Sequence, residues 1–418
     1  MIREFRAKNF RSIAGEQVLS FEATKDDLGE GFQVKTMPDG TRLLRFAVIY
    51  GANASGKTNV LKALAFVLNF IKSNNDVKKD DLISSDVVPF KFSEEYEGKD
   101  SEFIMVFYEN GKKFTYELKL NSKCVSYEKL LVYNTQKPSK IFERKFENEE
   151  DVIEFNTSLK IDERLKQDFK RYTLRNTSIF NTLNHVNTGL DDLEGIFKHL
   201  RIAFDRNVES IINNPEKKEF ALNLIREADF NIIDINVEKE KLPDEIIDHV
   251  ANSKKLPPLL IEKIKKAPYS TRVFFEHHAI DKDGKEVFAK IEDDDESKGT
   301  RSTVGFGLIL YDVLKNDIFF TDDEFEKSFH PEIMKKLIFF FLNNSNTTSQ
   351  LLITSHYDPL MDEIDKGNLR PDSFWFTDKK NDASTELYSL VEFNGLNSIK
   401  SIREAYRSGQ LGALPHIL

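Results

Sequence analysis

The sequence predicts an α/β protein that is built around a phosphate-binding loop, with a β-rich N-terminal part and a largely helical insertion. Residues 42–50, "RLLRFAVIY", form an apolar run of the kind found in buried strands. Residues 58–71, "TNVLKALAFVLNFI", carry apolar side chains at helical spacing. Between the two runs, residues 51–58, "GANASGKT", fit the pattern G-x-x-x-x-G-K-[ST].

The pattern predicts a nucleotide-binding loop, because backbone N–H groups in such a loop and the following helix N-terminus attract phosphates. Lys57 is expected to reach the β- and γ-phosphates, and the Thr58 hydroxyl to bind Mg²⁺. The residues predicted to bind the nucleotide here are Gly51, Asn53, Ala54, Ser55, Gly56, Lys57, Thr58 and Asn59.

The first 150 residues are rich in strand patterns on both sides of this loop. Residues 1–10 and 17–24 are expected to be strands that precede it, and residues 126–134 and 140–146 continue the strand character. Residues 101–120 predict a hairpin that turns at Asn110-Gly111. We assign residues 1–150 to the N-terminal part of the nucleotide-binding head.

The pattern changes near residue 150. Residues 192–212 and 217–229 have helical periodicity, whereas strands are expected to resume at 231–239 and 272–280. We therefore predict a mostly helical insertion at 151–270 and the C-terminal part of the head at 271–418.

An apolar strand that runs into acidic residues, "NDIFFTDDEFEKSFHP" (316–331), provides the second half of the expected chemistry. A carboxylate at the strand end can hold Mg²⁺, and the next carboxylate can polarise an attacking water. Counting back from the sequence "SFHP" assigns Asp323 to the metal and Glu324 to the water. Asp322 remains an alternative to Asp323 as the metal ligand.

Two further segments carry candidate residues. The strand "QLLITSHYDPLMD" (350–362) delivers His356, whose imidazole could donate a hydrogen bond to the γ-phosphate or to the attacking water. The segment "ESKGTRSTVGFG" (296–307) places Ser297 and Gly299 at the start of a helical pattern, which is a second phosphate-binding candidate. An ordinary helix cap would explain the same serine.

Composition restricts the classes of function. The formal net charge of −10 argues against a general nucleic-acid binder, although a local basic patch stays open. With Cys124 as the single cysteine, neither an intramolecular disulfide nor a cysteine zinc site can form. No apolar run approaches the length of a membrane span, and the N-terminus lacks a signal peptide. We expect a cytoplasmic protein without membrane contact.

The order of these motifs resembles the heads of ABC-type ATPases, including the SMC and RecF relatives. The chain is most similar to the RloA/AbiL type of AAA family ATPase, found beside restriction–modification and abortive-infection loci. The resemblance rests on the segments "FRAKNFRSI", "YGANASGKTNVLKAL", "ESKGT", "DEFEKSFHP", "TSHYDPLMD", "DSFWFTDK", "STELYSLVEF" and "AYRSGQLGALP".

This resemblance implies an enzyme that binds ATP and Mg²⁺, hydrolyses ATP and forms a homodimer or a higher oligomer when nucleotide is bound. It also implies that Ser297 and Gly299 of one protomer cover the γ-phosphate of the other. The expected role is a sensor or regulator in antiviral defence that acts on a separate effector protein encoded nearby. The resemblance leaves open whether the protein also binds nucleic acid.

The alternative is a DNA-repair or chromosome-maintenance ATPase of the RecF or SMC class, in which long coiled coils would be expected. A transporter head and a nuclease that joins a similar ATPase to a Toprim domain are weaker options. About sixty residues follow His356, which is short for an added nuclease domain.

Overall fold

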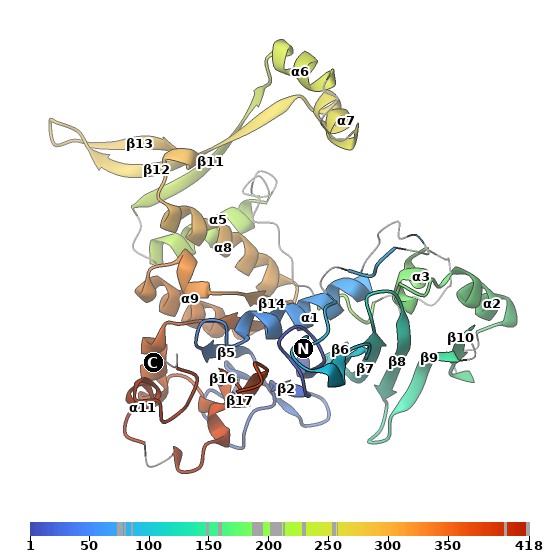
Figure 1. The fold of residues 1–418 in the computed structure, drawn as a ribbon. Helices are drawn as coiled ribbons and strands as arrows, with labels where there is room; N and C mark the ends of the chain where they lie inside the picture. Colours follow the sequence, from blue (N-terminus) through green and yellow to red (C-terminus); the bar gives the residue numbers. More distant parts are fainter. Residues whose placement is uncertain are drawn as a thin grey trace. The chain divides into compact units, whose positions relative to one another are not determined.

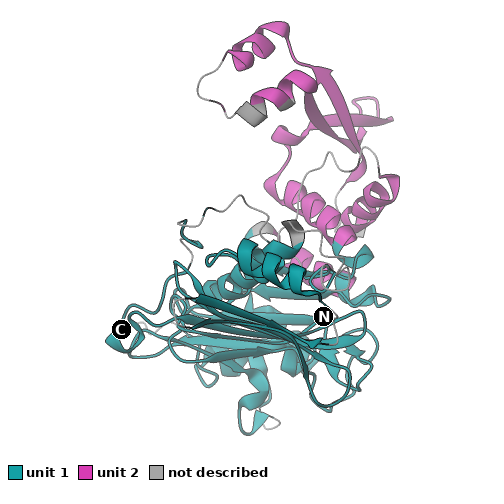
Figure 2. Cartoon of the chain, turned by 90° about the vertical axis from the view of Figure 1, so that its right-hand side faces the viewer, with its two compact units in different colours: residues 1–203, 313–327, 341–418 teal, residues 204–312, 328–340 magenta. Residues whose placement is uncertain are grey.

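The computed structural model describes residues 1–72, 78, 81–84, 87–147, 150–157, 161–185, 195–200, 211, 214–227, 231–252, 256, 258–396 and 399–414. The chain divides into two compact units (Figure 2). Unit 1 comprises residues 1–203, 313–327 and 341–418, and unit 2 comprises residues 204–312 and 328–340.

The centre of unit 1 is a five-stranded sheet with the order β14-β15-β5-β16-β17. Its strands are β14 (Phe319–Asp322), β15 (Gln350–Thr354), β5 (Phe46–Gly51), β16 (Phe374–Lys379) and β17 (Thr385–Ser389). The first four strands are parallel, and β17 is antiparallel to β16. All six residues of β5 are buried, as expected of a central parallel strand that is covered on both faces. The parallel strands bring the C-terminal ends of β5, β14 and β15 to one edge.

A seven-stranded antiparallel sheet forms the β-rich part of unit 1. Its order is β10 (Glu150–Phe155), β9 (Ser139–Glu147), β8 (Val125–Tyr133), β7 (Lys112–Leu120), β6 (Ser101–Glu109), β1 (Ile2–Lys8) and β2 (Gln17–Ser20). The hairpin predicted at Asn110-Gly111 is confirmed, because β6 and β7 pair up to Glu109 and Lys112. Both turn residues have positive φ, 49° and 74°, as a two-residue hairpin turn with right-handed strand twist requires.

Helix α1 (Lys57–Lys72) follows the phosphate-binding loop (Figure 1). It shares one hydrophobic core with both sheets. Phe66 stacks on Phe10 at 6.0 Å between ring centroids and lies 5.6 Å from the ring of Phe103 in β6. Buried Ile49 of β5 and Leu352 of β15 belong to the same core. Helix α1 therefore packs against residues of both sheets.

Smaller elements complete unit 1: β3 (Val34–Thr36), β4 (Arg42–Leu44), α2 (Glu163–Tyr172), α3 (Ile179–His185), α10 (Asp362–Asp365) and α11 (Ile402–Arg407). Buried Arg144 of β9 anchors the segment between α2 and α3, since it donates to the carbonyl oxygens of Leu174 and Thr177. The predicted α/β class, with a phosphate-binding loop and a β-rich N-terminal part, is confirmed.

Unit 2 combines helices with a three-stranded antiparallel ribbon (Figure 1). The ribbon consists of β11 (Ile232–Lys241), β12 (Tyr269–Ile280) and β13 (Glu286–Glu292), and α6 (Asp244–Ala251) and α7 (Pro258–Lys266) lie between β11 and β12 in the chain. The other helices are α5 (Pro215–Glu227), α8 (Lys298–Lys315) and α9 (Pro331–Asn343), and the last two continue into unit 1. Gly307 lets α8 approach α5 closely, because a Cβ there would lie 3.3 Å from the Ala221 Cα.

The compact units divide the chain at other residues than the sequence boundaries at 150 and 270. Residues 151–155 stay with unit 1, because β10 pairs with β9 along its whole length. Residues 271–292 stay with unit 2, because β12 pairs with β11 and β13. Residues 151–270 contain α2, α3, α5, α6 and α7 together with β10 and β11. No helix within the described ranges is long and apolar enough to cross a membrane.

Candidate nucleotide-binding site

Residues 51–58, named the phosphate loop below, connect the C-terminal end of β5 with the first turn of α1. Both glycines are required by close packing. A Cβ at Gly51 would lie 2.4 Å from Thr377 Oγ1, and one at Gly56 would lie 1.9 Å from Thr385 Oγ1. Ala54 adopts a positive φ of 63°, a conformation that non-glycine residues keep only where the surroundings enforce it.

A chain of hydroxyl groups enforces this loop conformation from outside. The Ser55 and Thr377 hydroxyls lie 2.6 Å apart, and Thr385 Oγ1 donates to the Ser55 carbonyl oxygen at 2.9 Å. Thr385 Oγ1 also lies 2.7 Å from Ser12 Oγ, which accepts a hydrogen bond from Asn59 Nδ2. The sequence reasoning assigned no role to Ser12, Thr377 or Thr385, although each lies in a segment that carries the family resemblance.

The ammonium group of Lys57 folds back onto the loop. Its Nζ donates to the carbonyl oxygens of Gly51 at 2.8 Å and Ala52 at 3.1 Å, and the residue is 6% exposed. Burial lowers the pKa of Lys57 below its ordinary value, and the nearby negative charges of Asp323 and Glu324 oppose that shift. A phosphate group at this position would compensate the desolvated positive charge.

Asp323 joins the phosphate loop to the neighbouring strand. Its Oδ2 accepts a hydrogen bond from Thr58 Oγ1 at 2.8 Å, and its Oδ1 accepts one from Thr354 Oγ1 at 2.5 Å. Asp322 is still part of β14, where it is paired with Ile353. Of the two aspartates that the sequence left open, the geometry favours Asp323 for the position beside Thr58.

Glu324 directly follows in a strained backbone position. Its φ is 53°, and its backbone N–H donates to Thr354 Oγ1 at 2.7 Å. The side chain is 31% exposed and forms an ion pair with Lys327. This backbone conformation turns the chain immediately after Asp323, so that the two consecutive carboxylates have different partners.

His356 follows the end of β15 and is held through its backbone. Its N–H donates to Glu326 Oε1 at 2.7 Å. Although the residue is exposed, the surrounding protein partly desolvates the imidazole, which lowers the pKa of His356, and the positive charge of Lys57 lowers it further. Sequence reasoning missed Glu326, which lies two residues after the predicted water-activating carboxylate.

Ser297 and Gly299 lie at the N-terminus of α8, in unit 2. Ser297 Oγ accepts the backbone N–H of Thr300 at 3.1 Å, which is the hydrogen bond of a helix N-cap. A Cβ at Gly299 would meet only Ser297 Oγ, at 3.8 Å. The phosphate loop, Asp323, Glu324 and His356 all belong to unit 1.

The residues of unit 1 fit an Mg²⁺–nucleotide complex. Thr58 and Asp323 supply hydroxyl and carboxylate oxygens, which are the ligand types that Mg²⁺ prefers, and the two are already in contact. Across the described ranges, no group of three or more His, Cys, Asp or Glu side chains could hold a metal ion. The metal would therefore depend on phosphate and water oxygens for the rest of its coordination.

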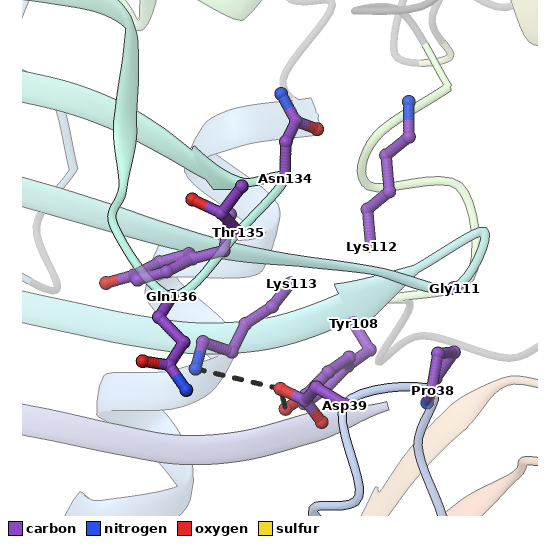
Figure 3. Close-up of a pocket in the computed structure, with 10 residues that line it drawn as sticks. Pro38, Asp39, Tyr108, Gly111, Lys112, Lys113, Asn134, Thr135 and Gln136 are labelled. Carbon is purple, nitrogen blue, oxygen red and sulfur yellow. Dashed lines mark hydrogen bonds and ion pairs between the residues drawn. The ribbon is translucent and has the colours of Figure 1, made fainter.

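A polar pocket of about 510 Å³ lies elsewhere in unit 1, beside the β6–β7 turn (Figure 3). Asp39 is its central charge: it accepts the Tyr108 hydroxyl at 2.7 Å and lies 3.8 Å from Lys113 Nζ. The strand register places this turn near the N-terminal end of β1, whereas Ser12 and its contacts with the phosphate loop follow the C-terminal end. The pocket is therefore separate from the nucleotide site.

Comparison with solved structures returns SMC heads of low sequence identity. The SMC head domain from Thermotoga maritima is 13% identical, with 93% of this chain and 98% of that chain covered and a TM-score of 0.40. The Smc head with an extended coiled coil bound to the C-terminal domain of ScpA, from Pyrococcus furiosus, is 12% identical, with 98% of each chain covered and a TM-score of 0.42. A Smc head bound to the C-winged helix domain of ScpA is 12% identical, with 95% and 99% coverage and a TM-score of 0.46.

A family comparison is more specific, whereas no curated protein matches the chain. The family described as "AAA domain, putative AbiEii toxin, Type IV TA system" matches residues 46–362, which is more than half of the sequence. The matched range begins at β5 and includes the phosphate loop, Asp323, Glu324 and His356. With this match and a phosphate loop whose geometry suits a nucleotide, the chain belongs to this family of AAA-domain ATPases.

Proposed function

We propose that the protein binds ATP with Mg²⁺ at the phosphate loop and hydrolyses it in an ATP-dependent dimer. The observation that carries this proposal is the hydrogen-bonded link Thr58–Asp323–Thr354. It joins the residue that ends the phosphate loop to the ends of β14 and β15. An acidic turn that only terminates β14 would not require a hydrogen bond from the Thr58 hydroxyl to Asp323.

Each residue has a separate task in this proposal. The loop N–H groups and Lys57 bind the phosphates, while Thr58 and Asp323 hold the metal, which supplies charge neutralisation on the phosphate oxygens when bound. Glu324 orients the attacking water and accepts its proton. His356 donates a hydrogen bond toward the γ-phosphate or that water.

Dimerisation would complete the site. Ser297 and Gly299 at the N-terminus of α8 offer a hydroxyl and a helix end without a bulky side chain, which suits a phosphate oxygen. In the proposed dimer these residues of one protomer cover the nucleotide of the other, so that ATP becomes part of the interface.

We further propose the RloA/AbiL type within the family and a cytoplasmic role as a defence regulator that acts on a separate effector. The family description, which names a "putative AbiEii toxin" and a "Type IV TA system", supports this context. The alternative is an SMC- or RecF-like maintenance ATPase. In the described part of unit 2, the β11–β13 ribbon and helices of at most 18 residues take the place of an extended coiled coil, which favours the first proposal.

The decisive experiment uses Glu324→Gln, which keeps the side-chain shape and removes the base. We expect ATP binding to persist, turnover to fall on the order of 10²–10⁴-fold, and a closed dimer to accumulate in light scattering with ATP and Mg²⁺. Adding Ser297→Arg should return the protein to the monomer while each copy still binds ATP. Lys57→Ala, with Lys62→Ala on the exposed face of α1 as its matched control, should lose ATP binding.

Normal turnover in Glu324→Gln would refute the catalytic role of this carboxylate. Equal oligomeric states with and without Ser297→Arg would refute the shared nucleotide interface. Unchanged ATP affinity in Lys57→Ala would refute the assignment of the phosphate loop itself.

A further inference from the structure

Residues 355–358, named the histidine turn below, are held by three separate elements of unit 1. The first is the segment after β14, since Glu326 Oε1 accepts the His356 N–H at 2.7 Å. The second is β5, since the Tyr50 hydroxyl donates to the Tyr357 carbonyl oxygen at 3.0 Å. Within the turn, Ser355 Oγ accepts the Tyr357 N–H at 2.9 Å.

The third element is the helix α11, close to the C-terminal end of the described chain. Arg407 of this helix binds Asp358 with two hydrogen bonds, Nε to Oδ2 at 2.5 Å and Nη2 to Oδ1 at 3.1 Å. Such a bidentate pair fixes the orientation of both groups in addition to their distance. Glu326 contacts the turn at His356, and Asp358 lies two residues later. The contact with Arg407 therefore restrains the C-terminal end of the histidine turn.

The same helix is anchored against the strand that leads into the phosphate loop. The buried Tyr406 ring lies 6.0 Å from the Tyr50 ring and 5.7 Å from the Phe376 ring of β16. Tyr50 therefore contacts both the helix and the histidine turn, and it directly precedes Gly51. Helix α11 is thereby packed on the scaffold of the phosphate loop and tied to the histidine turn by one ion pair.

We propose that α11 is a positioning element for the nucleotide site, in which Arg407 sets the place of His356 through Asp358. This inference rests on the proposed role of His356 at the nucleotide. Arg407 itself is exposed and points to a carboxylate outside the reacting groups, so it is a positioning residue and not a catalytic one. The proposal also gives a role to Tyr406 and Arg407, which lie in one of the segments that carry the family resemblance.

The ion pair contributes modestly to stability, because the Arg407 side chain is 59% exposed and solvent screens the pair from that side, while the Asp358 side chain is 16% exposed. A structural role and a positioning role therefore predict different results. Loss of a surface ion pair with only a structural role would leave turnover unchanged. Displacement of a catalytic hydrogen-bond donor lowers kcat without weakening ground-state binding, and small misplacements cost up to about 10²-fold.

The chain offers a matched control on the same helix. Arg403 forms an ion pair with Asp362 at 2.8 Å, and its partner lies four residues beyond Asp358. Arg403→Ala therefore removes a similar contact of α11 without releasing the histidine turn. A charge exchange, Arg407→Asp with Asp358→Arg, restores an ion pair at the original place.

The test measures kcat and KM for ATP hydrolysis, the Kd for ATP and the melting temperature of the full chain. We expect Arg407→Ala to lower kcat about tenfold, with ATP affinity within about twofold of wild type and a nearly unchanged melting temperature. Arg403→Ala should keep wild-type kcat, and the charge exchange should recover part of the loss. The kcat of Arg407→Lys should lie between those of wild type and Arg407→Ala, because lysine keeps the charge but not the bidentate geometry.

Wild-type kcat in Arg407→Ala, or an equal loss in Arg403→Ala, would overturn the inference. His356→Ala separates this failure from a failure of the proposed function. If His356→Ala lowers kcat while Arg407→Ala does not, only the positioning role is wrong. If His356→Ala keeps full turnover, the role of the histidine fails and the positioning role fails with it.

Discussion

Thr385→Val is the sharpest test of how the phosphate loop keeps its conformation. Valine keeps the branched shape of threonine and replaces its hydroxyl, in a residue that is 1% exposed, with a methyl group that cannot form hydrogen bonds. That hydroxyl donates to the Ser55 carbonyl oxygen at 2.9 Å and lies 2.7 Å from Ser12 Oγ. The substitution leaves the carbonyl oxygen of buried Ser55 and the half-buried Ser12 hydroxyl with one partner fewer.

The structure sets the size of the effect. Each lost hydrogen bond contributes about 0.5–1.5 kcal/mol, so the two together amount to about 1–3 kcal/mol. If the whole loss destabilises the loop conformation that binds phosphate, ATP affinity falls about 5- to 150-fold, since about 1.4 kcal/mol is a tenfold change. Gly56 packs directly on Thr385, so the loss acts on the centre of the loop.

Thr347→Val is the matched control. Thr347 is also a buried threonine of unit 1, and its hydroxyl donates to Asp317 at 2.7 Å and lies 2.6 Å from Ser349 Oγ. Both variants should lower the melting temperature by similar amounts, while only Thr385→Val should weaken binding of a fluorescent ATP analogue in titration. Wild-type affinity in Thr385→Val, despite a lowered melting temperature, would refute the reasoning.

Two further predictions concern the same site. Asp323→Ala should impair Mg²⁺-dependent hydrolysis more than Asp322→Ala, because Asp323 accepts the Thr58 hydroxyl; the reverse ranking in steady-state turnover would move the metal ligand by one residue. ATP affinity should weaken as pH rises toward 10.5, the ordinary pKa of lysine, and earlier than for an exposed lysine. Burial lowers the pKa of Lys57 and bound phosphate raises it again, so binding takes up a proton in that window. A wild-type ATP affinity that stays constant as pH rises through that window would contradict this.

Local signals accounted for the elements around the site. The phosphate loop, the strand before it, the helix after it and the Asn110-Gly111 turn each depend on a few neighbouring residues, so their pattern is visible in the sequence. The choice between Asp322 and Asp323 as the metal ligand could not be made from such local signals. It depends on where β14 ends against β15 and on the hydroxyl of Thr58, a residue 265 positions away.

The support of the loop was not predictable for the same reason. Ser12, Thr377 and Thr385 lie in segments that carry the family resemblance, but their roles depend on the fold. Thr377 and Thr385 contact Ser55, and Ser12 contacts Thr385 and Asn59, only after distant segments have come together. The unit boundaries likewise follow strand pairing. Strand β10 pairs with the preceding strand β9 across residue 150, and β12 pairs with β11 although α6 and α7 lie between them in the chain. Periodicity shows that a strand exists and not which partner it has.

The four residues 323–326 connect the two halves of the proposed chemistry. Asp323 accepts the hydroxyl of Thr58 from the phosphate loop, and Glu326 accepts the backbone N–H of His356 from the histidine turn. Between them, the Glu324 N–H and the Asp323 carboxylate both bind the hydroxyl of Thr354, which lies directly before the turn. A metal that replaced the Thr58–Asp323 hydrogen bond would therefore act on a segment that also holds the histidine. Because the residues share one short turn, the position of the metal ligand and the position of His356 are set together, which makes Thr354→Val a substitution that should disturb both.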